Sequence, residues 1–262
     1  MSFYSLRIVA LLTVLITVAF SPHTQAAVNM PELMNRSGMQ RMLSQRIAKA
    51  YFYGGSDVSV REMKLQLDMA IDRFKKNHAV LKANVEDTET KDLLSFVEDN
   101  FSEYSELVNK PYNQENAIRV LELSDTLLKA CHSVVLNLED QSGDHIDHII
   151  NVSGKQRMLS QRVSKFYIAY QAGFRDEATV QKLNNSVEEF ESGLKKLMSE
   201  GRNNKEINAL LVKSKKEWER ISPYFLKVRK GGLSLMVLTA TDEITKLADR
   251  VTSLYVEKIA AK

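Results

Sequence analysis

Two arginines, Arg41 and Arg157, are the residues of this chain whose type and placement are best suited to ligand chemistry. Each stands in a 17-residue segment that occurs twice, at 35–51 (the first box) and at 151–167 (the second box). Twelve of the 17 positions are identical, polar positions among them. A planar guanidinium group binds small planar oxyanions through paired charge-assisted hydrogen bonds, which a lysine does not reproduce. The two boxes therefore indicate a candidate anion site.

On a helix, the residues of the first box divide into two stripes. One stripe is ordinary bundle core and consists of Met39, Leu43, Ile47 and Ala50. The other is semi-polar and consists of Gly38, Arg41, Met42, Gln45 and Lys49. Because a glycine lets another backbone approach closely, the semi-polar stripe predicts a contact between helices that holds a polar site.

If the two box helices meet, Arg41 and Arg157 face one another. Two guanidinium groups in contact repel by roughly 1 to 4 kcal/mol, and an anion between them reverses the sign. We expect the ligand-binding residues to be Arg41, Arg157, Gly38, Gly154, Gln45 and Gln161. Arg46 lies about 140° from Arg41 on the helical wheel, so we expect it to pair with a carboxylate inside its own bundle.

The box also has other interpretations. Its arginines and glutamines can tie helices together as a packing signature without any ligand, or the site can hold a ligand other than an oxyanion. Spin labels at Ser44 and Ser160 would show whether the boxes touch, because one straight helix joining the copies would hold them about 45 Å apart.

The rest of the chain predicts an all-α fold with two tandem up-down-up-down four-helix bundles related by internal duplication. Apolar residues recur at three- and four-residue spacing, and the 116-residue offset extends beyond the box, pairing Phe74 with Phe190 for example. After the first box helix, broken at Gly54, we expect helices at about 57–84, 89–108, 115–141, up to 172, 176–199, through Trp218 to Ile221, and to the C-terminus. Ser222-Pro223-Tyr224 and Gly231-Gly232 are expected to form a longer connection.

The domain plan follows from these signals. Residues 1–26 have one base, an apolar run of 13 residues and a small-residue exit, which is the layout of a signal peptide. We expect cleavage before Ala27, export to the periplasm, a first bundle at 27–142 and a second at 143–262. Around Gly143 the pattern fits either a helix C-cap followed by an N-cap or one helix through both bundles.

Several function classes find little support. The charge of +3 is spread along the chain, whereas nucleic-acid binding calls for a clustered basic stripe. We expect no enzyme, catalytic residue or cofactor, because nucleophile–base pairings and glycine-rich phosphate loops are missing. His145 and His148 have the spacing of metal ligands but no evident third partner, so no metal site is expected. Cys131 and Trp218 are expected in the core.

The residues of the box carry a resemblance to a known family. Asn-x-x-Gly-x-x-Arg-Met-x-Ser-x-Arg is similar to the periplasmic box of nitrate/nitrite sensor kinases, and Gly-x-Gln-Arg-Met-Leu-Ser-Gln-Arg resembles the PilJ-type N-terminal domain of type IV pilus chemotaxis transducers. The resemblance implies that one arginine from each box, Arg41 and Arg157, grips nitrate at a dyad. The chain departs from the pattern where Arg36 of the first box is matched by Val152 in the second, which predicts a lopsided site.

Two functions follow from this comparison. One is an exported, ligand-binding sensory module that holds a nitrate-like or nitrite-like oxyanion and reports to a membrane-bound sensor kinase or chemotaxis receptor, with a homodimer as a further possibility. The other is a ligand-free structural or adaptor protein of the periplasm.

Overall fold

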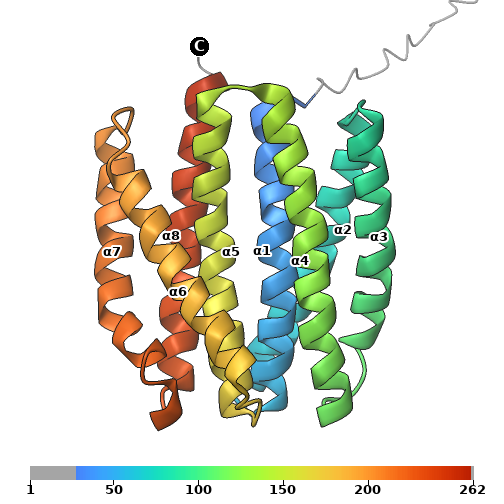
Figure 1. The fold of residues 1–262 in the computed structure, drawn as a ribbon, viewed down its shortest axis with the longest axis vertical. Coiled ribbons are helices and arrows are strands. Elements are labelled where there is room, and N and C mark those ends of the chain that lie inside the picture. Colours follow the sequence, from blue (N-terminus) through green and yellow to red (C-terminus); the bar gives the residue numbers. More distant parts are fainter. Residues whose placement is uncertain (1–27, 261–262) are drawn as a thin grey trace, which may run out of the picture.

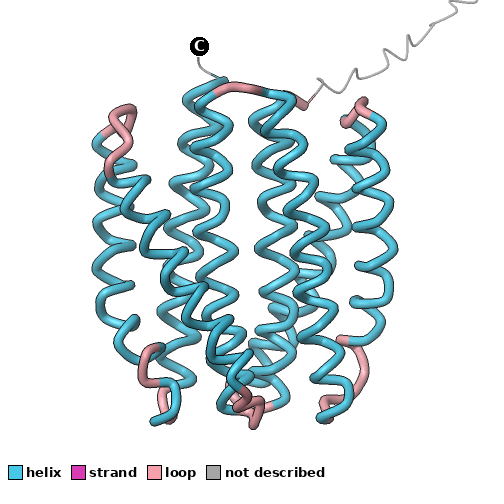
Figure 2. Tube along the Cα trace, viewed as in Figure 1, coloured by secondary structure: helices cyan, strands magenta, loops and turns pink. Residues whose placement is uncertain are grey.

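The computed structural model describes residues 28–260, and in this part of the chain helices joined by loops are the regular secondary structure (Figure 2). Its elements are α1 (Met30–Gly55), α2 (Val60–Asn84), α3 (Thr88–Leu107), α4 (Gln114–Ser142), α5 (His145–Gln171), α6 (Glu177–Met198), α7 (Lys205–Phe225), the short 3-10 helix η1 (Val228–Lys230) and α8 (Ser234–Ala260). The predicted all-α fold is confirmed.

The helices run up and down, with α1 and α5 side by side at the centre (Figure 1). Helix α1 packs on α2 and α4, and α3 completes this group, which we call the first half. Helix α5 packs on α6 and α8, and α7 completes the second half. Short loops between antiparallel neighbours are typical of up-down helix bundles. The box helices α1 and α5 therefore form the main contact between the halves, so the boxes touch and the halves lie side by side.

The junction between the halves is a helix break. Gly143 takes the left-handed conformation, with φ of 62°, directly after α4. Asp144 then caps α5, because its carboxylate accepts a hydrogen bond from the backbone N–H of Ile146. A glycine C-cap followed by an aspartate N-cap ends one helix and starts the next, so α5 returns antiparallel beside α4.

Two predicted helix boundaries were wrong. Helix α2 begins at Val60 and not near residue 57, because Asp57 and Ser59 have φ values of 58° and 52°, which a right-handed helix does not allow. Helix α7 continues through Pro223 to Phe225, although the proline was expected in the connection. A proline lacks the N–H that bonds the carbonyl four residues earlier, so α7 gives up one backbone hydrogen bond in its last turn.

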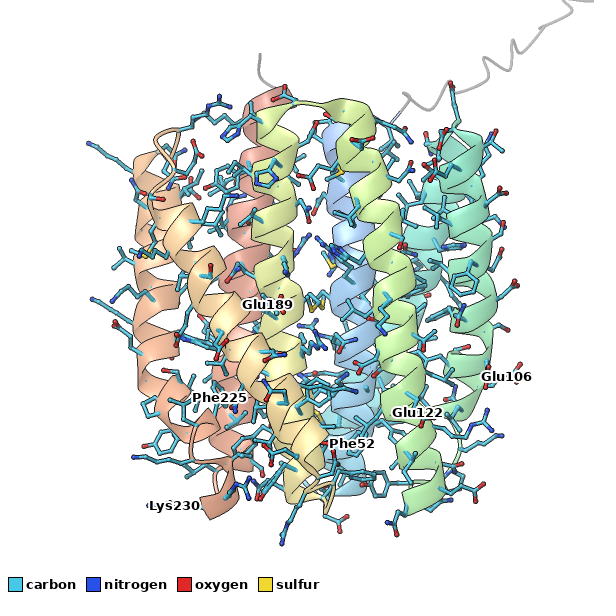
Figure 3. The ribbon with its side chains drawn as sticks, viewed as in Figure 1. Phe52, Glu106, Glu122, Glu189, Phe225 and Lys230 are labelled. Carbon is cyan, nitrogen blue, oxygen red and sulfur yellow. The ribbon has the colours of Figure 1, made fainter. Side chains whose placement is uncertain are left out.

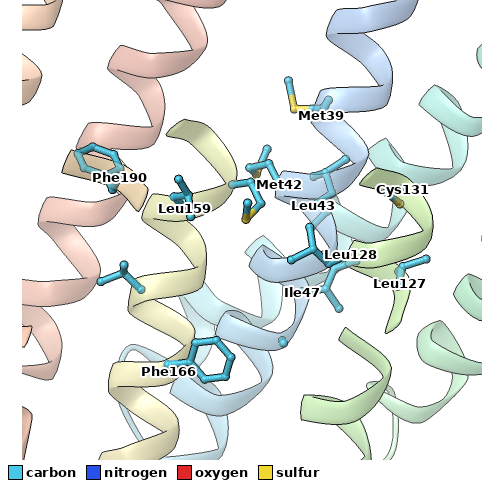
Figure 4. Packing of buried hydrophobic residues seen from close by; sticks show 14 of the residues in the cluster. Met39, Met42, Leu43, Ile47, Leu127, Leu128, Cys131, Leu159, Phe166 and Phe190 are labelled. Carbon is cyan, nitrogen blue, oxygen red and sulfur yellow. The ribbon is translucent and has the colours of Figure 1, made fainter. Parts of the chain in front are cut away.

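The core joins the two halves without interruption. The apolar stripe Met39, Leu43, Ile47 and Ala50 is buried, as predicted. Figure 4 shows Met42 of α1 and Leu159 of α5 facing one another across the junction, with Cys131 and Leu128 on α4 nearby. Cys131 and Trp218 are buried, which confirms their assignment to the core.

Within residues 28–260, no helix combines the length and apolar character that crossing a bilayer requires. The predicted signal peptide, residues 1–26, lies outside the described residues.

Candidate functional site

The box helices approach most closely at a pair of glycines. A Cβ atom placed on Gly38 would lie 4.0 Å from the Cα of Gly154. It would also lie 3.4 Å from Nη2 of Arg41 and 3.3 Å from Nη2 of Arg157. The missing side chains thus leave room for two guanidinium groups between the helices, where the semi-polar stripe placed them.

Both arginines make the same hydrogen bond across the contact between α1 and α5. Nη2 of Arg41 donates to the backbone carbonyl of Asn151, 3.4 Å away, and Nη2 of Arg157 donates to that of Asn35, 3.3 Å away. Each asparagine is the first residue of the opposite box. The two side chains are fully buried, so both boxes contribute equivalent contacts to the centre of the molecule.

The two arginines differ in how their charge is compensated. Nη1 of Arg157 donates to Oδ1 of Asp249 at 2.7 Å and to Oδ1 of Asn35 at 2.9 Å. Nη1 of Arg41 meets Nδ1 of His132 at 3.2 Å, and no carboxylate of residues 28–260 lies within 4.0 Å of the Arg41 guanidinium. The Nε atom of Arg41 is buried without a hydrogen-bond partner. Arg41 is therefore a buried cation without a carboxylate in contact in the described part of the chain, and Glu139 compensates its charge only from a greater distance.

His132 does not supply that charge. Burial, followed by the charges of Arg41 and Lys155, lowers the pKa of His132 to about 4, so the ring is neutral at pH 7 and its Nδ1 accepts from Arg41. Burial and the neighbouring Arg157 lower the pKa of Arg41 to about 10, which leaves the guanidinium protonated at pH 7. A buried charge without a partner in contact is costly, so the Arg41 guanidinium is the least compensated group of the two boxes.

The two predicted glutamines lie in the same buried stripe, but their amides bond elsewhere. Nε2 of Gln45 donates to the backbone carbonyl of Ser124 on α4 at 2.9 Å. Nε2 of Gln161 donates to Oδ1 of Asp242 at 2.9 Å and to Thr245 at 2.6 Å. These amides bond α1 to α4 and α5 to α8, while the two arginines occupy the glycine contact.

The expectation that Arg46 pairs within its own bundle was wrong. Its Nε donates to Oε1 of Gln161 at 3.2 Å, and its Nη2 lies 4.0 Å from Oδ1 of Asp242, both in the second half. Helix α8 lies beside α1 as well as beside α5, so a side chain on this face of α1 reaches a carboxylate of the other half. A helical wheel gives the direction of a side chain but not the helix it meets.

Two buried ion pairs that the sequence analysis missed also cross between the halves. Nζ of Lys49 lies 2.6 Å from Asp242 on α8, and Nζ of Lys165 lies 2.8 Å from Asp125 on α4. Both lysines are fully buried, and burial lowers the pKa of each to about 8, although the partner carboxylate opposes the shift. A usable signal was the recurrence of aspartate in the fourth helix of each half, 117 residues apart, against 116 for the lysines.

A cavity of about 580 Å³ lies over Arg41. Its floor is Arg41 on α1, and its walls come from α4, α5 and α6. Figure 3 labels two wall residues, Glu122 on α4 and Glu189 on α6. The remaining lining residues are Asp125, Thr126, Leu128, Lys129, His132, Lys155, Met158, Arg162 and Lys182. Glu122, Lys129 and Lys182 are exposed, so the cavity opens to solvent between α4 and α6.

The histidine pair near the helix junction makes ordinary polar contacts. His145 lies 3.4 Å from Glu200, and His148 contacts Glu139 and Lys196. Within the described residues, no group of three or more His, Cys, Asp or Glu side chains is arranged to hold a metal ion.

Comparison with known proteins shows that part of this chain is similar to a known family. Residues 141–252 match the PilJ family model, described as the N-terminal domain of type IV pili methyl-accepting chemotaxis transducers. The match begins at the end of α4 and extends into α8, and it includes the second box; the first box lies outside it. The predicted resemblance to the PilJ-type domain is confirmed for this range. No curated protein and no solved structure was found to match the chain.

Proposed function

We propose, on the premise that residues 141–252 are a PilJ-type transducer domain, that this protein is a sensory module that binds a small anion at Arg41 and reports it to a membrane-bound receptor. One observation carries the proposal. Arg41 is fully buried, has no carboxylate partner in the described residues and lines a cavity that opens to solvent.

The two box arginines have different roles in this proposal. Arg41 bonds the anion directly, because its buried Nε has no hydrogen-bond partner and Arg41 is one of the residues that line the cavity. Arg157 remains bonded to Asp249 and Asn35, and its position over Gly38 fixes the spacing of the helices at the site. An asymmetric site was expected because Arg36 is matched by Val152. The asymmetry proposed here has another cause, which is that Arg157 has a carboxylate partner and Arg41 has none among residues 28–260.

Binding at this position provides a route to a signal. The anion would compensate a charge located between α1, α4 and α5, and so it would stabilise the contact between the two halves. A ligand can shift a conformational equilibrium only through different affinities for the two states. We propose that the two states differ in the packing of α1 against α5 and that a membrane partner senses this difference.

The test is thermal and chemical unfolding of the purified mature chain with sodium nitrate and sodium nitrite, against sodium chloride at equal ionic strength. An anion at 100 times its Kd should add about 2.7 kcal/mol to the free energy of unfolding. Arg41→Gln should remove this gain. Arg46→Gln is the matched control, because it changes an arginine of the same box outside the cavity and should retain the gain.

The outcome that rejects anion binding is equally clear. If no inorganic or organic anion shifts the unfolding of the unmutated chain, and Arg41→Gln only destabilises it, Arg41 is a packing residue. The ligand-free adaptor then becomes the better description.

Export to the periplasm is part of the proposal. The short apolar run and the Thr24-Gln25-Ala26 exit support cleavage before Ala27. Mass spectrometry of a periplasmic extract should find a chain that begins at or within a few residues of Ala27, whereas full-length chain in the membrane fraction would contradict it.

A further inference from the structure

The cavity over Arg41 is larger than a small inorganic oxyanion requires. A water molecule, which has one heavy atom, occupies roughly 30 Å³, so an ion of four heavy atoms fills at most about a fifth of 580 Å³. Cavities of about 300 to 1,000 Å³ are typical of sites for organic ligands. The size and lining of the cavity therefore bear on the class of anion.

A second cationic group lines the same cavity away from Arg41. Lys155, Met158 and Arg162 follow one another on one face of α5, at intervals of three and four residues. The Nε atom of Arg162 is buried without a hydrogen-bond partner, and no carboxylate of residues 28–260 lies within 4.0 Å of its guanidinium. Asp125, a carboxylate at this end, is bonded to Lys165 and Lys182, at 2.8 and 2.7 Å.

The stretch between the two arginines is apolar. Leu128 stands on α4 between Asp125 and His132, and Met158 stands on α5 between Lys155 and Arg162. Both apolar side chains are buried. Along the cavity the two unpaired guanidinium groups thus lie on either side of an apolar stretch. The lining also includes carboxylates, of which Asp125 is bonded to Lys165 and Lys182 and Glu189 to Lys155.

The equivalent positions of the other half are internally neutralised. Arg46, which matches Arg162 in the second box, lies near Asp242 and bonds Gln161, and Arg157 is paired with Asp249. The repeated boxes provide two equivalent pairs of arginines, Arg41 with Arg162 and Arg157 with Arg46. Only the first pair lacks a carboxylate within 4.0 Å among residues 28–260.

These observations assign a ligand class to the site, and the assignment rests on the proposed function. We propose that the cavity takes a linear aliphatic dicarboxylate, one carboxylate on Arg41 and the other on Arg162, with its methylene chain against Leu128 and Met158. Arg41 reaches α5 at the level of Gly154, eight residues before Arg162. That is about 12 Å of helix rise between the two levels, and the guanidinium carbon of Arg162 lies 5.5 Å from the centre of the Phe166 ring. A ligand with two separated carboxylates fits such a spacing, whereas one small oxyanion does not.

The experiment is titration calorimetry of the full mature chain at pH 7 and constant ionic strength. The probes are succinate, glutarate and adipate, with butyrate and nitrate as monoanions. We expect at least one diacid to bind ten or more times tighter than butyrate. Arg162→Gln should abolish that ratio while butyrate affinity stays within about twofold, and circular dichroism will verify that the variant is folded. Arg46→Gln, the matched position of the first box, should keep the ratio.

The possible failures separate the two proposals. If butyrate or nitrate binds as tightly as every diacid, or if Arg162→Gln leaves the ratio unchanged, the dicarboxylate assignment is overturned and anion binding at Arg41 stands. If no probe binds and Arg41→Gln changes no titration, both are overturned.

Discussion

The substitution His132→Asp tests the main difference between the two halves, which is how the charge of the box arginine is compensated. In the second half, Oδ1 of Asp249 accepts from Nη1 of Arg157; in the first half, Nδ1 of His132 takes that place beside Nη1 of Arg41. Oδ1 of an aspartate and Nδ1 of a histidine are both bonded to Cγ. An aspartate at position 132 therefore places a carboxylate oxygen near the position of Nδ1, on a guanidinium without a counter-charge.

The expected effect has two parts. A hydrogen bond to a charged group contributes about 1.5 to 3 kcal/mol, so His132→Asp should raise the free energy of unfolding of the ligand-free chain by about that amount. The lower end is the better guide, because Asp249 in the reference pair is 38% exposed. The same carboxylate competes with an external anion for Arg41. Since about 1.4 kcal/mol corresponds to a tenfold change in affinity, the lower end of that range predicts a loss of anion affinity of about tenfold.

The assay is urea unfolding at pH 7, followed by far-ultraviolet circular dichroism, with and without anion. His132→Asn is the control, because it has the shape of aspartate without the charge. Asp249→His is the reciprocal change and should destabilise the chain by leaving Arg157 unpaired. If His132→Asp is no more stable than His132→Asn, Arg41 does not need a counter-charge and the reasoning is refuted.

Further expectations concern the ion pairs and the glycine contact. Asp242→Asn should lower the free energy of unfolding by about 3 to 5 kcal/mol in urea, because it leaves Lys49 buried and unpaired; an effect below about 1 kcal/mol would show that the pair does not join the halves. Burial alone would raise the pKa of Asp242, but Lys49 and other neighbours lower it to about 2, so its contribution to stability should be complete above about pH 4 and disappear as the pH falls through 2; pH-dependent unfolding of the wild type against Asp242→Asn measures this, and parallel curves below pH 4 would contradict it. Gly38→Ala should weaken anion binding, since its Cβ would press on both guanidinium groups, while Gly201→Ala, which adds a Cβ in open space, should not; equal affinities in calorimetry would remove Gly38 from the site.

Much of the fold was predictable because its signals are local. Spacing of apolar residues gave the helices to within a few residues, and the glycine of each box predicted a close helix contact, which lies at Gly38 and Gly154. The two boundary errors have local causes too, namely left-handed residues before α2 and a proline accepted inside α7. The left-handed conformation of Asp57 and Ser59 does not follow from composition, since serine and aspartate occur with negative and with positive φ.

The site was predictable only in part. Arg41 and Arg157 lie together as their shared stripe required, but the partners of Arg46 and of the box lysines belong to the opposite half. A helical wheel describes one helix and carries no information on which other helix lies beside it. His132 went unnoticed for the same reason, because its importance comes from standing where the other half has Asp249.

The packing interpretation and the binding interpretation of the box therefore apply to different copies of it. In the second half, Arg157 is bonded to a carboxylate of α8 and behaves as a packing residue. In the first half, the same residue type meets a neutral histidine of α4 and a cavity. Since the boxes share the sequence Gln-Arg-Met-Leu-Ser-Gln-Arg, the box itself cannot decide between them. The residue that the fourth helix of each half presents to the arginine decides whether its charge is neutralised internally or, as we propose for Arg41, left for a ligand.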